Sequence, residues 1–329
     1  MTAPDRAKAQ RLLPIDAWRF IAAVAIVWLH TCSDGYLAAS TAATRFAVPF
    51  FSAAAMFLLY LSIRRKPETK FPPFLARRVQ RLYFPFLAWS AIYFASSNLK
   101  RHYLSHRPPV PFGPSFFWVG TSQQLWFLPF LLAATLGGFW ICRGMTQRTD
   151  KSQRGMAMVL TLIGLIFCFI PMPWYGLAAL GDDVPATRYL LAMTWDTLPA
   201  VFWGLAFAAI SWRPPAWIGL SVFLAAIAAL FFVGRNSLLE NLAGVAVLAS
   251  ASADWDSPLI RKLAQFGPDA YGIYLAHVLF IQAMFTFAQR AKIPNSIPLK
   301  LAEFAVALLA SYALVRLLHQ SRWTRWING

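Results

Sequence analysis

The chain has 329 residues, of which 58% are hydrophobic and only 13% are charged. A soluble domain has about 45–50% apolar and about 25% charged residues, so this composition is that of a membrane protein. The net charge is +17, but the basic residues lie between apolar blocks, where they orient membrane spans and meet lipid headgroups, which argues against a nucleic-acid partner. The cysteines Cys32, Cys142 and Cys168 are scattered without metal-ligand spacing, so no metal site is expected.

The candidate membrane spans are apolar blocks of about the length that crosses a bilayer, roughly 20 residues per helix. In chain order they cover residues 14–33, 45–63, 82–97, 124–142, 155–172, 189–211, 216–234, 238–252, 266–288 and 299–319. The block at 238–252 is short and contains Asn241. No small-residue cleavage site follows the first block, which favours a retained span over a cleaved signal peptide. The sequence therefore predicts an all-α integral membrane protein with about ten transmembrane helices, in a single domain over residues 1–329.

Basic residues predict the orientation of these spans. With a cytoplasmic N-terminus, 20 Lys and Arg residues lie in cytoplasmic segments and 9 in outer segments. Positive charge is enriched on the cytoplasmic side of membrane proteins. We therefore expect both termini to be cytoplasmic, with a basic cytoplasmic segment at 64–81 and an outer loop at 98–123.

The first span carries a set of polar residues, namely Asp16, Arg19, His30 and Asp34. Charges at membrane depth are costly and usually functional. His30 follows Arg19 by eleven positions, which is roughly 1100° of helix rotation and leaves the two on one face. At 1.5 Å per residue they lie about 16 Å apart along the axis. A polar stripe is therefore predicted to cross most of the membrane.

Two neighbour spacings add detail to this stripe. Asp16 and Arg19 are three residues apart, and His30 and Asp34 are four apart. Asp34 could accept a hydrogen bond from His30 and leave the other ring nitrogen as a base. Alternatively, Asp16 and Arg19 lie at the headgroup boundary and Asp34 is solvated. We favour solvation for Asp34 and a functional role for His30.

Three further elements are candidates for chemistry. Arg78 and Arg81 are three residues apart at the start of a cytoplasmic helix, and paired guanidinium groups bind phosphate; a stop-transfer cluster is the alternative. Tyr274 and His277 are close enough to contact each other, although such a pair is often only an interhelix hydrogen bond. Trp126 opens the fourth block and could be an interfacial anchor.

The remaining polar residues give weaker signals. Asp196 and Glu303 fall inside apolar blocks, where a carboxylate needs a partner that the sequence does not name. His102, His106 and His319 are interpreted as surface residues.

The order and spacing of these elements resemble acyltransferase family 3, the multi-pass membrane O-acyltransferases of bacterial surface polysaccharides. The matching elements are a Leu-Asp-x-x-Arg-like segment at 13–23, an Arg-(ten residues)-His signature from Arg19 to His30, Pro-Phe-Phe at 49–51, Arg-x-x-Arg at Arg78 and Arg81 followed by Pro85, a Trp-Phe element at 125–128 and a Tyr-Leu-x-His element at 271–277. The chain has Ala55-Met56 where the family usually has Ser-Gly. The resemblance runs in order from about residue 11 to about residue 280.

This resemblance implies a function and roles for the polar residues. His30 would be the catalytic histidine, with Arg19 and Asp16 on the same helix. It would act as a general base on the acceptor hydroxyl or be transiently acylated itself. We add Tyr274 as a candidate donor to the oxyanion. Arg78 and Arg81 would hold the phosphates of a cytoplasmic acyl-CoA, acetyl-CoA by default, as a co-substrate rather than a bound cofactor. The acceptor would be a hydroxyl of an exported glycan or a lipid-linked saccharide, at the bacterial cytoplasmic (inner) membrane.

Two other classes of function are compatible with the composition. A transporter or flippase in polysaccharide export could use Asp16, Arg19, His30 and Glu303 as an ion path. Such carriers often contain repeats related by symmetry, and no such symmetry is evident in the sequence. A scaffold for a glycan-assembly complex would need neither His30 nor the arginine pair.

Overall fold

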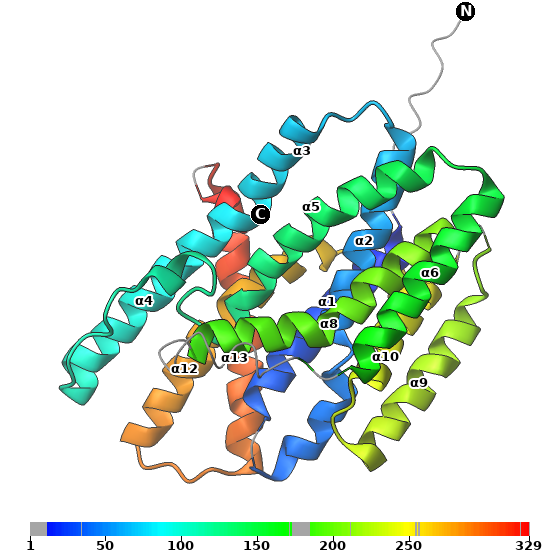
Figure 1. Cartoon of the computed structure of the whole chain (residues 1–329). Helices are drawn as coiled ribbons and strands as arrows, with labels where there is room; N and C mark the ends of the chain where they lie inside the picture. Colours follow the sequence, from blue (N-terminus) through cyan, green and yellow to red (C-terminus); the bar gives the residue numbers. More distant parts are fainter. Residues whose placement is uncertain are drawn as a thin grey trace, which may run out of the picture.

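The computed structural model describes residues 12–33, 35–170, 172, 185–210, 212–253, 255, 257–322 and 324–328. All regular structure in these ranges is helical (Figure 1). The α-helices are α1 (Leu13–Thr31), α2 (Ala47–Arg65), α3 (Phe71–Arg78), α4 (Phe84–Ser105), α5 (Phe127–Thr146), α6 (Asp150–Phe169), α8 (Pro185–Ala209), α9 (Ala216–Val233), α10 (Ser237–Ser252), α11 (Pro258–Ala264), α12 (Ala270–Arg290) and α13 (Ile297–Gln320). Short 3₁₀ segments include η1 (Gly35–Thr44), η4 (Gln123–Trp126) and η5 (Gly267–Asp269).

Each of the ten predicted apolar blocks coincides with one of these helices, and the prediction of an all-α membrane protein is confirmed. Within the described residues, eight helical stretches are long and apolar enough to cross a membrane. The other two blocks correspond to α10, which is apolar but has only 16 residues, and to α4. The outer loop was expected to begin at residue 98, but α4 continues to Ser105. The cytoplasmic location of the termini remains a prediction.

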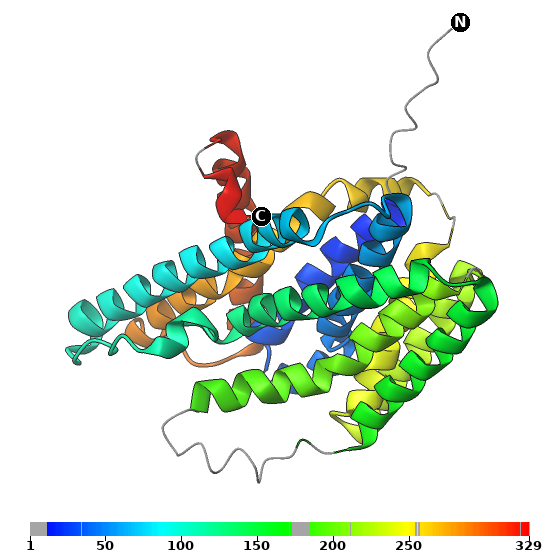
Figure 2. The same cartoon turned by 45° about the horizontal axis from the view of Figure 1, so that its top comes forward.

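Helix α1 lies in the middle of the bundle, with other helices around it in both views (Figures 1 and 2). Its small side chains Ala17, Ala22 and Ala23 are fully buried. Small residues let helices approach closely in a membrane, where packing rather than the hydrophobic effect holds helices together. Trp18 adds an edge-to-face contact with Phe46, at 6.1 Å between ring centroids. The polar residues of α1 are therefore carried by the central helix.

Helix α2 is held between α8 and α10 by two close backbone approaches. A Cβ at Gly204 of α8 would lie 2.6 Å from the Cα of Ala53, and one at Gly244 of α10 would lie 2.6 Å from the backbone nitrogen of Phe50. Only glycine fits at such distances. These crossings fix α2 against its two neighbours.

A π-helical turn, η2 (Val79–Tyr83), joins α3 to α4. Pro85 has no N–H, so the carbonyl of Arg81, four residues earlier, loses its α-helical donor. The hydroxyl of Tyr271 on α12 donates to this carbonyl instead, at 3.3 Å. Single π turns of this kind occur frequently at functional sites. The helix that carries the arginine pair is thus tied to α12.

The carboxylates inside apolar blocks have basic partners. Asp196 is 3.0 Å from Arg235, and the buried Glu303 is 3.4 Å from Lys300. Pairing offsets the cost of holding a carboxylate away from water. These contacts supply the partners that the sequence did not name.

The chain connections lie at two opposite ends of the bundle (Figure 1). The α2–α3 and α5–α6 connections are at one end, whereas η1 and the α12–α13 connection are at the other. This alternation agrees with the predicted cytoplasmic and outer segments. We keep the terms cytoplasmic end and outer end for them as a prediction.

Candidate active site

The imidazole rings of His30 and His277 lie against each other, with 5.1 Å between their centroids. His30 is in the last turn of α1, and His277 is fully buried in the first half of α12. The two residues are nearly 250 positions apart in the sequence, and packing of α1 on α12 brings them together. The predicted supporting residue Asp34 lies outside the described residues.

Backbone contacts fix the tautomer of His277. Its Nδ1 lies 2.7 Å from the carbonyl oxygen of Tyr274 and 3.3 Å from that of Ile273. A carbonyl oxygen only accepts, so Nδ1 carries the proton. Nε2 is buried and has no hydrogen-bond partner among the described residues. In the neutral ring Nε2 is then an unpaired acceptor nitrogen, and the ring that carries it lies against that of His30.

One side of α12 links the histidines to the arginine pair. Tyr271, Tyr274 and His277 follow one another at three-residue steps, over roughly 9 Å of helix. Tyr271 donates to the carbonyl of Arg81, as described above, and the Tyr274 hydroxyl donates to the backbone carbonyl of Gln124. The hydroxyl that was predicted as an oxyanion donor is thus engaged with the backbone in this structure.

The segment η4 brings a buried amide to this region. Gln124 is 2% exposed, and its Oε1 accepts a hydrogen bond from the Ser122 hydroxyl at 2.6 Å. Its Nε2 lies near the Tyr93 hydroxyl but makes no hydrogen bond of normal geometry among the described residues. Trp126, which the sequence singled out, is buried against Phe130 with 5.7 Å between ring centroids. Gln124 was missed, because a lone glutamine before an apolar run has no motif of its own.

Asp16 and Arg19 form the expected pair near the start of α1, with 3.2 Å between Asp16 Oδ1 and Arg19 Nη1. The segment η5 packs directly on them, since a Cβ at Gly267 would lie 2.7 Å from the Cβ of Asp16. The structure therefore places this pair beside the start of α12, at the opposite end of α1 from His30.

A second carboxylate cluster at this end was not predicted. Asp269 in η5 is 2% exposed and lies 3.6 Å from Arg316 and 3.4 Å from Nδ1 of His319, both on α13. His319, which was interpreted as a surface residue, is partly exposed, and its ring also contacts Asp269. The sequence does contain a signal for this cluster, because Arg316 and His319 are three residues apart and therefore lie on one face of a helix.

The arginine pair lies at the end of α3 and in the π turn. The guanidinium of Arg78 is partly buried, with its Cζ 5.1 Å from the centroid of the Phe74 ring, and Arg81 is exposed. Burial, followed by repulsion from Arg81 and Arg77, lowers the pKa of Arg78. Like charges crowded in this way attract an anion, which relieves their repulsion.

The structure thus brings some predicted site residues together and keeps others apart. His30, His277 and Tyr274 form one cluster, with Gln124 and Trp126 on the adjoining segment. Arg78 and Arg81 lie apart from this cluster, and the hydrogen bond from Tyr271 on α12 to the Arg81 carbonyl is one connection between the two regions. Among the described residues, no group of three or more His, Cys, Asp or Glu side chains could hold a metal ion.

The helices define a multi-pass membrane protein in which a buried histidine, His277, lies against a second, partly buried one, His30. A family model described as an acyltransferase domain matches residues 13–316, so the chain belongs to the membrane-bound acyltransferase 3 family. No curated protein and no solved structure matches the chain.

Proposed function

We propose that this protein transfers an acyl group, acetyl by default, from a cytoplasmic acyl-CoA to a hydroxyl of an exported glycan at the bacterial inner membrane. The contact between the His30 and His277 rings carries the proposal. In this proposal His30 is a base near the outer end of the central helix α1. The arginine pair lies at the cytoplasmic end.

The histidines divide the proton chemistry between them. His30 accepts the proton of the attacking hydroxyl, whose oxygen forms the new C–O bond with the thioester carbonyl carbon. The C–S bond then breaks, and the departing thiolate receives the proton from His30. His277 is a positioning residue: in the substrate complex its Nε2, which has no partner among the described residues, accepts an N–H from His30, and its own Nδ1–H is fixed by the Tyr274 carbonyl. A fixed tautomer of this kind orients a catalytic imidazole.

The negative charge on the tetrahedral intermediate needs a donor, and Gln124 supplies it. A preorganised N–H in a site without water stabilises an oxyanion strongly. The Nε2 amide of Gln124 is buried without a normal hydrogen bond, whereas the Tyr274 hydroxyl is already engaged. Tyr274 instead positions the Gln124 backbone.

The arginine pair binds the phosphates of the acyl-CoA. Arg78 and Arg81 crowd positive charge at the π turn, and guanidinium groups remain charged at any working pH. The acyl thioester would then extend along the Tyr271–Tyr274 side of α12 toward the histidines. Arg19, paired with Asp16, adds a cation at the same end.

Acyl transfer from radiolabelled acetyl-CoA by the purified full chain in vesicles, with exported glycan as acceptor, tests this assignment. Arg78→Gln/Arg81→Gln should raise the KM for acetyl-CoA by about 10-fold or more, since each lost charge-assisted hydrogen bond is worth roughly 1.5–3 kcal/mol. The loss of kcat should be smaller, because both residues lie away from the reacting atoms.

The matched control is Arg65→Gln/Lys66→Gln, which removes the same charge from the same basic segment. An equal rise in KM for both double variants would mean that the overall positive charge of the segment attracts acyl-CoA, and that Arg78 and Arg81 do not form a specific phosphate site. Absence of transfer by the wild type, together with glycan flux without acyl donor, would support the transporter instead.

A further inference from the structure

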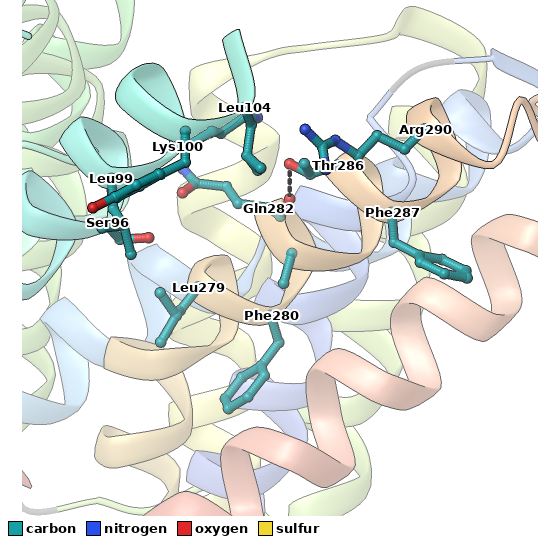
Figure 3. A pocket seen from close by; sticks show the side chains of 12 residues that line it. Ser96, Leu99, Lys100, Leu104, Leu279, Phe280, Gln282, Thr286, Phe287 and Arg290 are labelled. Atoms are coloured by element: carbon teal, nitrogen blue, oxygen red, sulfur yellow. Dashed lines mark hydrogen bonds between the residues drawn. The ribbon is translucent and has the colours of Figure 1, made fainter. Parts of the chain in front are cut away.

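A groove of about 610 Å³ lies between the outer halves of α4 and α12, and none of the proposed catalytic or phosphate-binding residues lines it (Figure 3). Its walls are largely apolar, with Leu99 and Leu104 from α4 facing Leu279, Phe280 and Phe287 from α12. In the protein alone, Leu99 is 61% exposed and Phe287 is 60% exposed. The volume is in the range of clefts that bind small-molecule ligands.

One polar group on the α12 wall, the hydroxyl of Thr286, is satisfied within its own helix. The hydroxyl of Thr286 donates to the carbonyl of Gln282 at 2.7 Å, which is drawn as a dashed line in Figure 3. This hydrogen bond turns the hydroxyl back toward its own helix. The groove therefore offers an apolar surface along most of its length.

Two cations lie along the groove, and none of its lining residues is acidic. Lys100 of α4 reaches toward α12, with its Nζ 5.8 Å from the centroid of the Phe285 ring. Arg290 is the last residue of α12, and its side chain extends toward Leu104 of α4 (Figure 3). With the predicted topology, this end of α12 lies at the level of the outer headgroups.

We propose that this groove binds an anionic phospholipid, with its phosphate held by Lys100 and Arg290 and its hydrocarbon chains along the apolar walls. Cationic pockets between transmembrane helices favour anionic headgroups. A zwitterionic lipid offers the same phosphate, but its ammonium group would face the two cations at the same rim. The site is therefore selective for net negative charge.

The bound lipid would pack on the helix that carries His277. Leu279 and Phe280, at the inner end of the groove, are only two and three residues beyond His277. The inference does not depend on the acyltransferase proposal, because lipid binding is measured without acyl donor or glycan.

Native mass spectrometry of the purified full chain, equilibrated with equal amounts of dioleoyl phosphatidylglycerol and dioleoyl phosphatidylcholine, tests the proposal. The wild type should retain phosphatidylglycerol preferentially. Lys100→Gln/Arg290→Gln should reduce this preference by roughly 10–30-fold, since each cation near the membrane surface contributes a few-fold. Ala283→Trp, which fills the groove, should reduce retention of both lipids.

The control Arg107→Gln/Lys292→Gln removes the same charge from the predicted outer side without touching the groove. All variants are first required to elute as single species with wild-type thermal unfolding. Cross-links from a diazirine-bearing phosphatidylglycerol should map to peptides containing 99–104 and 279–290. Equal retention of the two lipids by the wild type, an equal effect of the control pair, or cross-links confined to other helices would each overturn the proposal.

Discussion

His277 shows how a single buried side chain acquires a role from its surroundings. A histidine in an apolar helix is most often a structural hydrogen-bonding residue, and its Nδ1 contact with the Tyr274 carbonyl fits that description. The unpartnered Nε2 beside His30 does not, because a buried polar atom without a partner costs free energy. A substrate-dependent hydrogen bond explains why such an atom is kept.

Replacement of His277 by Gln and by Phe separates these roles. Phe should lower kcat by about 10²-fold or more, as removal of the group that orients a catalytic histidine does. Gln, which keeps an acceptor near the position of Nε2, should restore part of the rate. Acyl transfer and thermal unfolding are measured on both variants. Equal activity of the two variants at equal stability would contradict a positioning role.

Gln124 provides an independent test at the same scale. Gln124→Met keeps the side-chain volume and removes the amide donor, so kcat should fall by about 10²–10³-fold while the KM for acetyl-CoA changes little. The control is Gln123→Met, which alters the exposed neighbour. Wild-type kcat in the Gln124 variant would exclude the amide as the oxyanion donor.

At the scale of elements, the sequence predicted the helices well and their contacts poorly. Apolar length identified all ten blocks, because the bilayer imposes one physical requirement on each. The hydrogen bond that ties the π turn to α12 was not predicted, since Tyr271 reaches the Arg81 carbonyl from a helix almost 200 residues away. The Asp269 cluster was missed for the same reason, because its three members come together only when η5 meets α13.

The close crossing of α2 and α8 predicts how a glycine-to-alanine substitution there changes the stability of the protein. Alanine is intrinsically favoured over glycine in a helix by roughly 1 kcal/mol. At Gly204, however, the new Cβ would meet the Ala53 backbone at 2.6 Å, so Gly204→Ala should destabilise by about 1–3 kcal/mol. Gly137→Ala in α5, where nothing lies within 4 Å of the new Cβ, should be neutral or stabilising. Thermal unfolding in detergent compares the two, and equal midpoints would contradict the close approach.

At the scale of the whole molecule, the sequence predicted the class of protein and a large part of the candidate site. The Arg19–His30 spacing on one helix needs only helical geometry, so α1 could be analysed from the sequence. The contact of His30 with His277 and the place of Gln124 needed the packed bundle. The fold also explains why the two ends of the candidate site differ. Arg78 and Arg81 are crowded together near the start of α12, whereas the pair of His30 and His277 lies further along this helix.

The central claim is that His30 acts as the base in the transfer of an acyl group from a donor on the cytoplasmic side to an acceptor on the outer side. The most direct measurement adds radiolabelled acetyl-CoA to the outside of inverted membrane vesicles, which expose the cytoplasmic face, and of right-side-out vesicles. The wild type should label glycan inside inverted vesicles only. His30→Ala should lower that labelling by about 10²-fold or more at equal protein level, whereas His102→Ala should not. Wild-type labelling by His30→Ala, or labelling from right-side-out vesicles, would contradict the account.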